Sequence, residues 1–343
     1  LTFEQCACSL NFIMPTDSAT CFQSHDKRFS AIIGPTPALE LLAEHQAYPF
    51  AHEAGVFFPD TNNLYITSNR CVGPNNEQKV YITRVDLNKR PVAYEEISTD
   101  IPMANGGINY GQSDIIFCSQ GSMDQPSGLY RMSTRSYQSE ILKSDFFGRQ
   151  FNSVNDVVVH TDGSIWFTDP IYGFEQGYRP PPRLPNQVYR WCPDSGNIRA
   201  MADGFGRPNG ICFSPDEKVA YITDTDRVHG DGTVDDQRVS SIYAFDMSEY
   251  GREKFLTNRR LFAMADQGIP DGIKCDLEGN VYSGCGDGIN VWYPGGVLLG
   301  RVLIEGGVAN FCFGRNGEIF ALNEHRLWRV QLGATVKGAL LIL

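Results

Sequence analysis

Six segments of the chain follow one pattern, and this repetition limits the folds that the chain can adopt. Each segment has a polar residue, a short apolar run, a turn rich in Asp, Gly or Asn, and a second apolar run centred on an aromatic residue. Repeats of roughly 40 to 60 residues are typical of stacked or radially arranged units. The aromatic residues are Tyr65, Phe117, Trp166, Tyr221, Tyr282 and Phe320, separated by 52, 49, 55, 61 and 38 residues.

The apolar runs have the alternation of β-strands. Ile165 and Phe167 would face one side of a sheet while Trp166 and Thr168 face the other. Most units continue into a third run with its own aromatic residue, as in "NQVYRWCPDSG" and "SSIYAFDM", so each unit is predicted to be an antiparallel meander of three to four strands. Only the stretch "TPALELLAEHQ" at 36–46 favours a helix.

Six such sheets cannot each bury two faces alone, but they can when they pack radially around an axis. We therefore predict an all-β, six-bladed β-propeller over residues 48–335. The same interpretation gives an N-terminal extension with a short helix over 1–47, and a C-terminal tail over 336–343.

The charge balance argues against nucleic acid as a partner. The 343 residues include 29 Lys and Arg against 40 Asp and Glu, a net charge of −11 without any basic run. No apolar stretch approaches the roughly 20 residues of a membrane helix, so a membrane partner is not expected either. The oligomeric state stays open.

The cysteines and the start of the chain bear on the cellular compartment. Cys6, Cys8 and Cys21 lie in a polar, irregular segment that favours a disulfide, with Cys71 as a further candidate. The chain starts at Leu1 rather than Met, which either a cleaved signal peptide or a truncated sequence would explain. These features slightly favour a secreted over a cytoplasmic protein, whereas the lack of an N-x-S/T sequon weakens that inference.

Each repeat also places one carboxylate or carboxamide at nearly the same distance before its aromatic residue. Because the first strand of each propeller blade lines the central axis, these six side chains would form one ring around a tunnel. A water-filled polar tunnel is the alternative, but it would accept Ser, Thr, Lys or Gly equally well. The interval is 12 residues for Glu53, Asn105 and Asn209, 11 for Asn155 and Asp271, and 10 for Asn310.

Oxygen ligands without His or Cys select calcium or magnesium over zinc or copper. Magnesium prefers a tight octahedron with several waters, so a wide ring drawn from separate blades favours calcium, with magnesium or another divalent cation as the alternative. A cation in this tunnel could polarise a substrate carbonyl or phosphoryl oxygen and stabilise the charge that develops there.

Longer stretches of the sequence resemble a known group of proteins. The runs "NSVND", "RPNGICFSPDEKVAYITDTD" and "IPDGIKCDLEGNVYSGCGDGINVW" resemble the regucalcin, gluconolactonase and diisopropyl fluorophosphatase superfamily of six-bladed propellers. The run "FGRQFNSVNDVVVHTDGSIWFTDPIYGFEQGYRPPPRLPNQVYRW" is similar to the fungal lactonohydrolases, which open aldonate and pantoyl lactones. The resemblance extends from about residue 48 to 333. It implies calcium held by Glu53, Asn155, Asn209 and Asp271.

The resemblance further implies a metal-dependent hydrolase that opens a small-molecule lactone or ester. Asp271 is the best candidate for the catalytic base or nucleophile, because a metal-bound carboxylate can present its free oxygen to water or substrate. Glu53 is the second candidate catalytic carboxylate. Asn105 and Asn310 are then left to support the metal ligands or to contact the substrate, and Tyr172 is a candidate substrate-binding residue at the tunnel mouth.

Two long insertions are predicted to shape the entrance of the tunnel. They are "FEQGYRPPPRLPN" after Trp166 and "RVHGDGTVDDQRVS" after Tyr221. His52 directly precedes Glu53, so strand alternation predicts that its side chain points away from the metal. Two other functions remain open: a metal-dependent propeller enzyme of secondary metabolism that hydrolyses another ester, isomerises or cyclises, and a non-catalytic propeller that binds a ligand.

Overall fold

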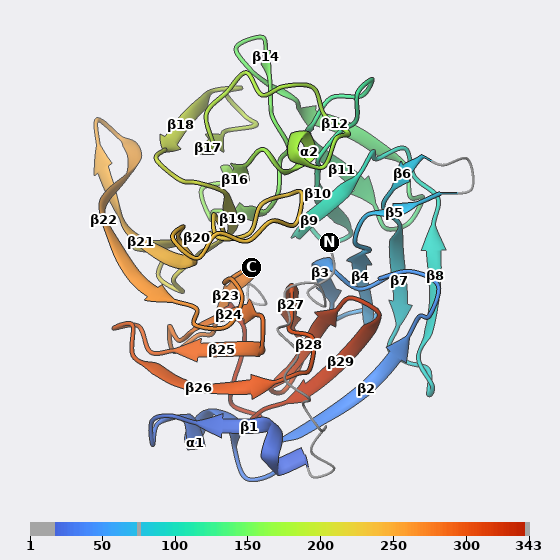
Figure 1. Cartoon of the computed structure of the whole chain (residues 1–343), viewed down its shortest axis with the longest axis vertical. Helices are drawn as coiled ribbons and strands as arrows, with labels where there is room; N and C mark the ends of the chain where they lie inside the picture. Colours follow the sequence, from blue (N-terminus) through green and yellow to red (C-terminus); the bar gives the residue numbers. More distant parts are fainter. Residues whose placement is uncertain (1–17, 74–76, 340–343) are drawn as a thin grey trace.

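The protein is a six-bladed β-propeller, which confirms the predicted fold (Figure 1). A computed structural model describes residues 18–73 and 77–339. Six antiparallel sheets of four or five strands surround a central axis. The innermost strands contact one another in turn, β3 to β9, β15, β19, β23, β27 and back to β3, so the ring is closed.

Four blades are built from strands that follow one another in the chain. The first comprises β3 (Glu53–Phe58), β4 (Asn63–Thr67), β7 (Ile82–Asp86) and β8 (Ala93–Ile97). The second comprises β9 (Ala104–Tyr110), β10 (Asp114–Ser119), β11 (Gly128–Ser133) and β12 (Ser139–Lys143). The third comprises β15 (Val157–Val159), β16 (Ile165–Asp169), β17 (Gln187–Trp191) and β18 (Ile198–Ala202). The fourth comprises β19 (Pro208–Phe213), β20 (Val219–Asp224), β21 (Ser241–Tyr250) and β22 (Glu253–Met264).

The fifth and sixth blades recruit strands from the N-terminal part of the chain. The fifth comprises β23 (Ile273–Cys275), β24 (Val281–Cys285), β25 (Gly288–Trp292) and β26 (Leu298–Leu303), with β1 (Phe22–Ser24) as its outermost strand. The sixth comprises β27 (Asn310–Phe313), β28 (Glu318–Asn323) and β29 (Arg326–Gln331), and β2 (Ala38–Glu44) completes it. In Figure 1 the blue strand β2 lies along the red strand β29, which joins the two ends of the chain within one blade.

The remaining elements are short. Two small hairpins, β5 (Cys71–Val72) with β6 (Gln78–Lys79) and β13 (Asp145–Phe146) with β14 (Arg149–Gln150), project from the blades. The helical elements are η2 (Ser18–Cys21), α1 (Phe29–Ile33) and α2 (Tyr172–Glu175). No helix in residues 18–73 and 77–339 is long and apolar enough to cross a membrane.

The helix predicted over 36–46 is wrong, because these residues form strand β2. Leu39 pairs with Val330 and Leu41 with Trp328 in an antiparallel register. Ala, Leu and Glu favour a helix locally, but the free edge of β29 supplies backbone partners that override this preference. The described part of the N-terminal extension is therefore built into the propeller, and its short helical elements are η2 and α1.

The six repeat aromatic residues fill the spaces between blades. All six are buried. Trp166 of the third blade packs edge-on against Phe213 of the fourth, with ring centroids 5.6 Å apart, and Tyr282 of the fifth meets Phe313 of the sixth at 5.1 Å. The repeat thus marks the contacts that hold neighbouring blades together, which is why it was detectable in the sequence.

Candidate metal centre and substrate cavity

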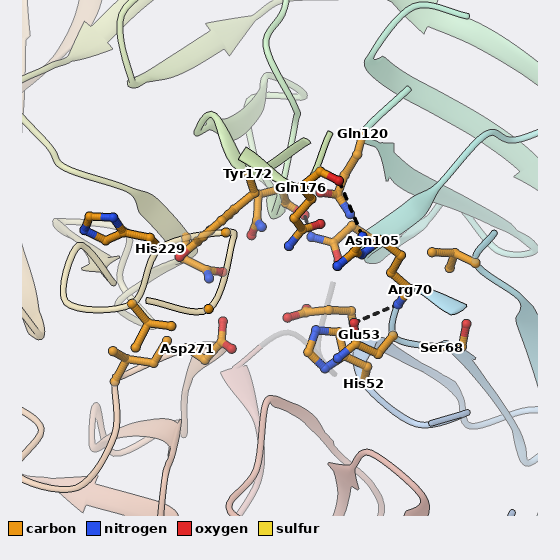
Figure 2. A pocket seen from close by; sticks show the side chains of 18 of the residues that line it. His52, Glu53, Ser68, Arg70, Asn105, Gln120, Tyr172, Gln176, His229 and Asp271 are labelled. Atoms are coloured by element: carbon orange, nitrogen blue, oxygen red, sulfur yellow. Dashed lines mark hydrogen bonds between the residues drawn. The ribbon is translucent and has the colours of Figure 1, made fainter. Parts of the chain in front are cut away.

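The predicted ring borders a cavity of about 110 Å³ at one end of the innermost strands. Five of its six members line this cavity, which Figure 2 shows from close by: Glu53, Asn105, Asn155, Asn209 and Asp271. A second cavity of about 40 Å³ lies further along the same strands, where Lys274 and Cys312 are among its lining residues. The ring therefore faces one defined chamber rather than an open, uniform tunnel.

A β-bulge at the start of β3 directs Glu53 into this chamber. The register with β4 shifts between Ala54 and Val56, and Ala54 adopts a φ of 64°. A left-handed conformation costs a non-glycine residue about 1–2 kcal/mol. Bulges of this kind re-aim a side chain near functional sites.

Glycines that follow ring residues let neighbouring blades approach closely. A Cβ on Gly210, after Asn209, would lie 2.5 Å from the Asp271 carbonyl oxygen of the next blade. A Cβ on Gly272, after Asp271, would lie 2.2 Å from the side-chain oxygen of Asn310. The Asn-Gly and Asp-Gly pairs of the sequence are therefore a steric requirement of the narrow ring.

Buried threonines connect the ring from one blade to the next. The hydroxyl of Thr67 donates to the Asn105 carbonyl (3.0 Å), and that of Thr168 donates to the Asn209 carbonyl (2.6 Å). Thr223 Oγ1 donates in the same way to the Asp271 carbonyl (3.0 Å). Each threonine stands two residues after a repeat aromatic residue, a regularity that sequence analysis could have used and did not.

Two aspartates hold the loops that lead into ring strands. Asp169 accepts the backbone N–H groups of Asn152 and Ser153, and Asp224 accepts those of Gly206 and Arg207, at 2.7–3.0 Å. Burial raises the pKa of Asp169 to about 7 and also raises the pKa of Asp224, although these hydrogen bonds oppose the shift. Asp224 thus supports the loop that carries Asn209.

The two ring carboxylates have strongly perturbed acidity. Burial, together with the charge of Asp271, raises the pKa of Glu53 to about 8. Burial and the neighbouring charge of Asp156 raise the pKa of Asp271 likewise to about 8. The charge of His52 only partly opposes the shift of Glu53, so the two buried carboxyl groups resist ionisation, and a cation between them would counter both shifts.

Two oxygens in the cavity wall have no hydrogen-bond partner in the described part of the chain. They are Asp271 Oδ1 and Asn155 Oδ1, and both side chains are buried. A buried acceptor without a donor costs about 1–3 kcal/mol, so such atoms require an explanation. Carboxylate and amide oxygens are the donors that Ca²⁺ and Mg²⁺ accept. Glu53, Asn155, Asn209 and Asp271 therefore fit a hard divalent cation, although within the described ranges no three His, Cys, Asp or Glu side chains form a metal-binding cluster.

Asn310 and Asn105 occupy different positions relative to the cavity. Asn310 does not line it; its Nδ2 donates to Glu53 Oε2 (2.7 Å) and its Oδ1 accepts the N–H of Phe311 (2.8 Å). Asn310 thus orients Glu53. Asn105 borders the cavity, and its Nδ2 lies 3.5 Å from the Asn155 carbonyl, which leaves it accessible to a bound molecule.

His52 lies in the cavity wall, contrary to the orientation that alternation predicted. The residue precedes β3, so strand periodicity does not apply to it. Its Nδ1 is 2.8 Å from Glu324 Oε1, and Asn69 Nδ2 donates to the other oxygen of Glu324 (3.1 Å). Burial opposes the charged imidazolium, but the adjacent Glu324 carboxylate raises the pKa of His52 overall.

Tyr172 and the two insertions form one wall of the cavity. Tyr172 lines it, and its hydroxyl is hydrogen-bonded to Thr225 Oγ1. Arg207 connects the two insertions. It forms ion pairs with Glu175 of α2 and with Asp226, which directly precedes the second insertion. Gln176 of the first insertion and the stretch 228–232 of the second also border the cavity, as expected for loops that shape its entrance.

The cysteine predictions fall largely outside the described residues. Cys6 and Cys8, two of the candidates for an N-terminal disulfide, lie in the part of the chain that is not described. Cys71 is a free thiol whose Sγ is 3.3 Å from the Lys79 carbonyl oxygen. The predicted disulfide therefore does not involve Cys71 in this structure.

Comparisons with known proteins agree with this architecture. The chain is 28% identical over 334 residues to the lactonohydrolase oryL of Aspergillus oryzae, covering 90% of this chain and 73% of that protein. It is 30% identical over 211 residues to a gluconolactonase of Zymomonas mobilis, covering 57% and 54%. Both relatives are named as hydrolases that act on lactones.

Solved structures show the same fold. A gluconolactonase from Xanthomonas campestris superposes with a TM-score of 0.73 at 26% identity, covering 91% of this chain and 94% of that one. The calcium-binding protein regucalcin from Agrobacterium tumefaciens superposes with a TM-score of 0.61 at 17% identity, covering 88% and 95%, and supports the fold alone. Residues 42–319 match the SMP-30/Gluconolactonase/LRE-like region, and the chain belongs to this family.

Proposed function

We propose that the protein is a calcium-dependent lactonase that opens a small lactone of the aldonate or pantoyl type. The observation that carries this proposal is the pair of unpartnered buried oxygens, Asp271 Oδ1 and Asn155 Oδ1, in a cavity that also contains the Glu53 carboxylate. The names of the relatives support the choice of a lactone as substrate. The cavity wall also carries amide side chains, among them Asn105, Gln120 and Gln176, that could bind the hydroxyl groups of such a lactone.

Glu53, Asn155, Asn209 and Asp271 would hold the cation. When bound, calcium supplies a positive charge that polarises a carbonyl oxygen and stabilises the oxyanion formed on attack. Magnesium or another divalent cation is the alternative. Asn310 fixes the orientation of Glu53 by donating to one of its oxygens. Asn105 and Tyr172 are proposed to contact the substrate from the cavity wall.

Asp271 is proposed to act as base or nucleophile. As base, the Asp271 oxygen that does not hold the cation accepts a proton from a water molecule whose oxygen forms the new bond to the lactone carbonyl carbon. The ring C–O bond then breaks, and the proton passes to the departing alkoxide. As nucleophile, the same Asp271 oxygen bonds to the carbonyl carbon, the ring C–O bond breaks and the departing alkoxide takes a proton from water; hydroxide or water then hydrolyses the resulting anhydride and restores the Asp271 carboxylate.

Hydrolysis of a panel of five- and six-membered lactones, with and without EDTA, tests the proposal. We expect EDTA to abolish activity and added calcium to restore it. Asp271→Asn should lower kcat/KM by about 10² or more, because general acid–base catalysis typically contributes 10²- to 10⁴-fold. Glu53→Gln should weaken calcium binding while the circular dichroism spectrum stays that of the wild-type protein.

Two outcomes contradict the mechanism. Full activity in EDTA would exclude a role for the cation, and wild-type kcat/KM in Asp271→Asn would exclude this carboxylate as base or nucleophile. Tyr137→Phe is a suitable control, because Tyr137 contacts Arg84 on the outer part of the blades and lies outside the cavity.

A further inference from the structure

We propose that Arg70 forms an anion-binding subsite at the wall of the cavity, which takes a carboxylate that the lactone carries outside its ring. This inference rests on the proposed lactonase function and narrows its substrates to aldonate-like lactones that carry a second carboxyl group, the lactones of dicarboxylic hydroxy acids. Arg70 lines the same cavity as Glu53 and Asp271 but belongs to the turn between β4 and β5. Figure 2 shows its side chain extending from this turn towards Asn105.

Hydrogen bonds to the side chains of Asn69 and Ser68 fix the backbone of this turn. Asn69 Oδ1 accepts the backbone N–H of Arg70 (2.7 Å), and Asn69 is itself buried and bonded to Glu324. Ser68 Oγ accepts the N–H of Tyr81 (2.8 Å), which joins the turn to the first residue before β7. Arg70 therefore projects from a well-supported point, and its position does not depend on a freely moving loop.

Among the described residues, the guanidinium group of Arg70 contacts only neutral acceptors. Its Nη1 donates to Gln78 Oε1 (2.8 Å) and to the Gln176 carbonyl (3.4 Å), and its Nε is buried without a partner. No carboxylate in residues 18–73 or 77–339 lies within ion-pair distance of Arg70. A buried N–H of a cation without an acceptor costs free energy, and an incoming anion would satisfy it.

Other arginines around the cavity are already engaged. Arg207 is paired with Glu175 and Asp226, and Arg227 is paired with Asp236. Arg179 donates to four backbone carbonyls, those of Phe151, Asn152, Ser122 and Gln125. These three side chains therefore serve the architecture of the entrance, whereas Arg70 retains an uncompensated charge.

The charge balance of the cavity indicates that Arg70 is available to bind an anion. The carboxylates of Glu53 and Asp271 would be neutralised by one divalent cation, so the positive charge of Arg70 would remain unbalanced when the site is loaded. Guanidinium groups bind carboxylates with two parallel hydrogen bonds, which gives both affinity and orientation. A carboxylate held there would place the lactone ring toward the carboxylates of the ring strands.

Matched lactones test the proposal. We would compare hydrolysis of γ-butyrolactone-γ-carboxylate and of its neutral γ-hydroxymethyl counterpart by the calcium-loaded protein. Arg70→Gln should lower the ratio of kcat/KM for the charged and neutral lactones about tenfold, a loss of about 1.4 kcal/mol. Most of the change should appear in KM, and Arg70→Lys should recover part of it, because lysine keeps the charge but not the fork.

Arg84→Gln is the matched control, because Arg84 lies on β7 of the same blade and pairs with Glu95 away from the cavity. Its ratio should equal that of the wild-type protein. An unchanged ratio in Arg70→Gln, or an equal fall in Arg84→Gln, would overturn the proposal.

A binding measurement separates this inference from the proposed function. If the wild-type protein hydrolyses neither this pair nor any lactone of the panel, the lactonase proposal fails, and binding of the open-chain dicarboxylate 2-hydroxyglutarate is then measured by calorimetry. Affinity that falls about tenfold in Arg70→Gln and stays constant in Arg84→Gln supports the subsite independently of catalysis. Equal affinity in the three proteins contradicts it.

Discussion

Glu53 and Asp271 bring two carboxyl groups into one buried wall. Within residues 18–73 and 77–339, the Asn310 amide is the only group that donates to Glu53, and Asp271 Oδ1 has no donor. Desolvation therefore dominates, and it raises the pKa of both carboxyl groups to about 8. Such residues are unfavourable for the empty fold and favourable for binding a cation, which is typical of a functional site.

The acidity of these residues predicts a pH-dependent stability in the absence of metal. A carboxyl group whose pKa is raised on folding stabilises the fold fully below its unfolded-state pKa of about 4, and this contribution is lost as the pH rises through about 8. The melting temperature of EDTA-treated protein should therefore fall between about pH 6 and pH 8. Added calcium should raise it most at the upper end of this range.

Thermal unfolding of a Glu53→Gln, Asp271→Asn double variant provides the comparison. The two amide side chains of this variant remain neutral at every pH. The slope of its melting temperature against pH in EDTA should therefore be flatter than that of the wild-type protein. Other titrating groups are common to the two proteins and cancel in the difference. Identical slopes would show that the two carboxyl groups do not ionise in this window.

At the scale of the strand, the site depends on contacts between one blade and the next. Thr223 illustrates this dependence, because its hydroxyl accepts the Gly210 N–H (2.7 Å) and donates to the Asp271 carbonyl (3.0 Å). It thus joins two consecutive ring strands, β19 and β23, through one buried oxygen. The position of Asp271 is set by the neighbouring blade as much as by its own.

Replacing this hydroxyl should therefore affect both stability and activity. Thr223→Val keeps the shape of the side chain but leaves a buried N–H and a buried carbonyl unpaired, which should destabilise the fold by about 1–3 kcal/mol. Calcium affinity should also fall, because Asp271 is displaced. Urea unfolding and calcium titration measure the two effects, and Thr223→Ser, which keeps the oxygen, should resemble the wild-type protein more closely in both. Wild-type stability and calcium affinity in Thr223→Val would show that the hydroxyl does not position Asp271.

The position of each site residue in the blade repeat decides whether it could be predicted from the sequence. Repeat spacing identified the cavity-lining ring residues because each lies at the start of an innermost strand, either on it or two residues before it. It did not find His52 or Arg70, which stand in turns where no periodicity operates. It also could not distinguish Asn310 from the other ring members, because that distinction depends on a hydrogen bond to Glu53, 257 residues away.

At the scale of the whole molecule, the sixth blade is completed by strand β2, whose residues would locally favour a helix. β2 is the outer strand of a blade whose other three strands come from the C-terminal part of the chain. Glu40 forms an ion pair with Arg329 across this junction, and Leu41 lies opposite the buried Trp328. The sequence contains no local signal for such a pairing, since nearly 290 residues separate the partners.

Because β2 completes the sixth blade, two truncated proteins, one without β2 and one with it, should differ clearly in aggregation and in unfolding. A chain that starts at His45 lacks β2, which would leave the edge of β29 and one face of Trp328 exposed. An unpaired edge strand invites intermolecular pairing, so this protein should aggregate and lose a single cooperative unfolding transition. A chain that starts at Gly34 lacks β1 and α1 but retains β2, so it should remain monodisperse and unfold cooperatively at a lower temperature. Differential scanning calorimetry and size-exclusion chromatography distinguish these outcomes, and equal melting temperatures for the two truncated chains would show that β2 does not close the ring.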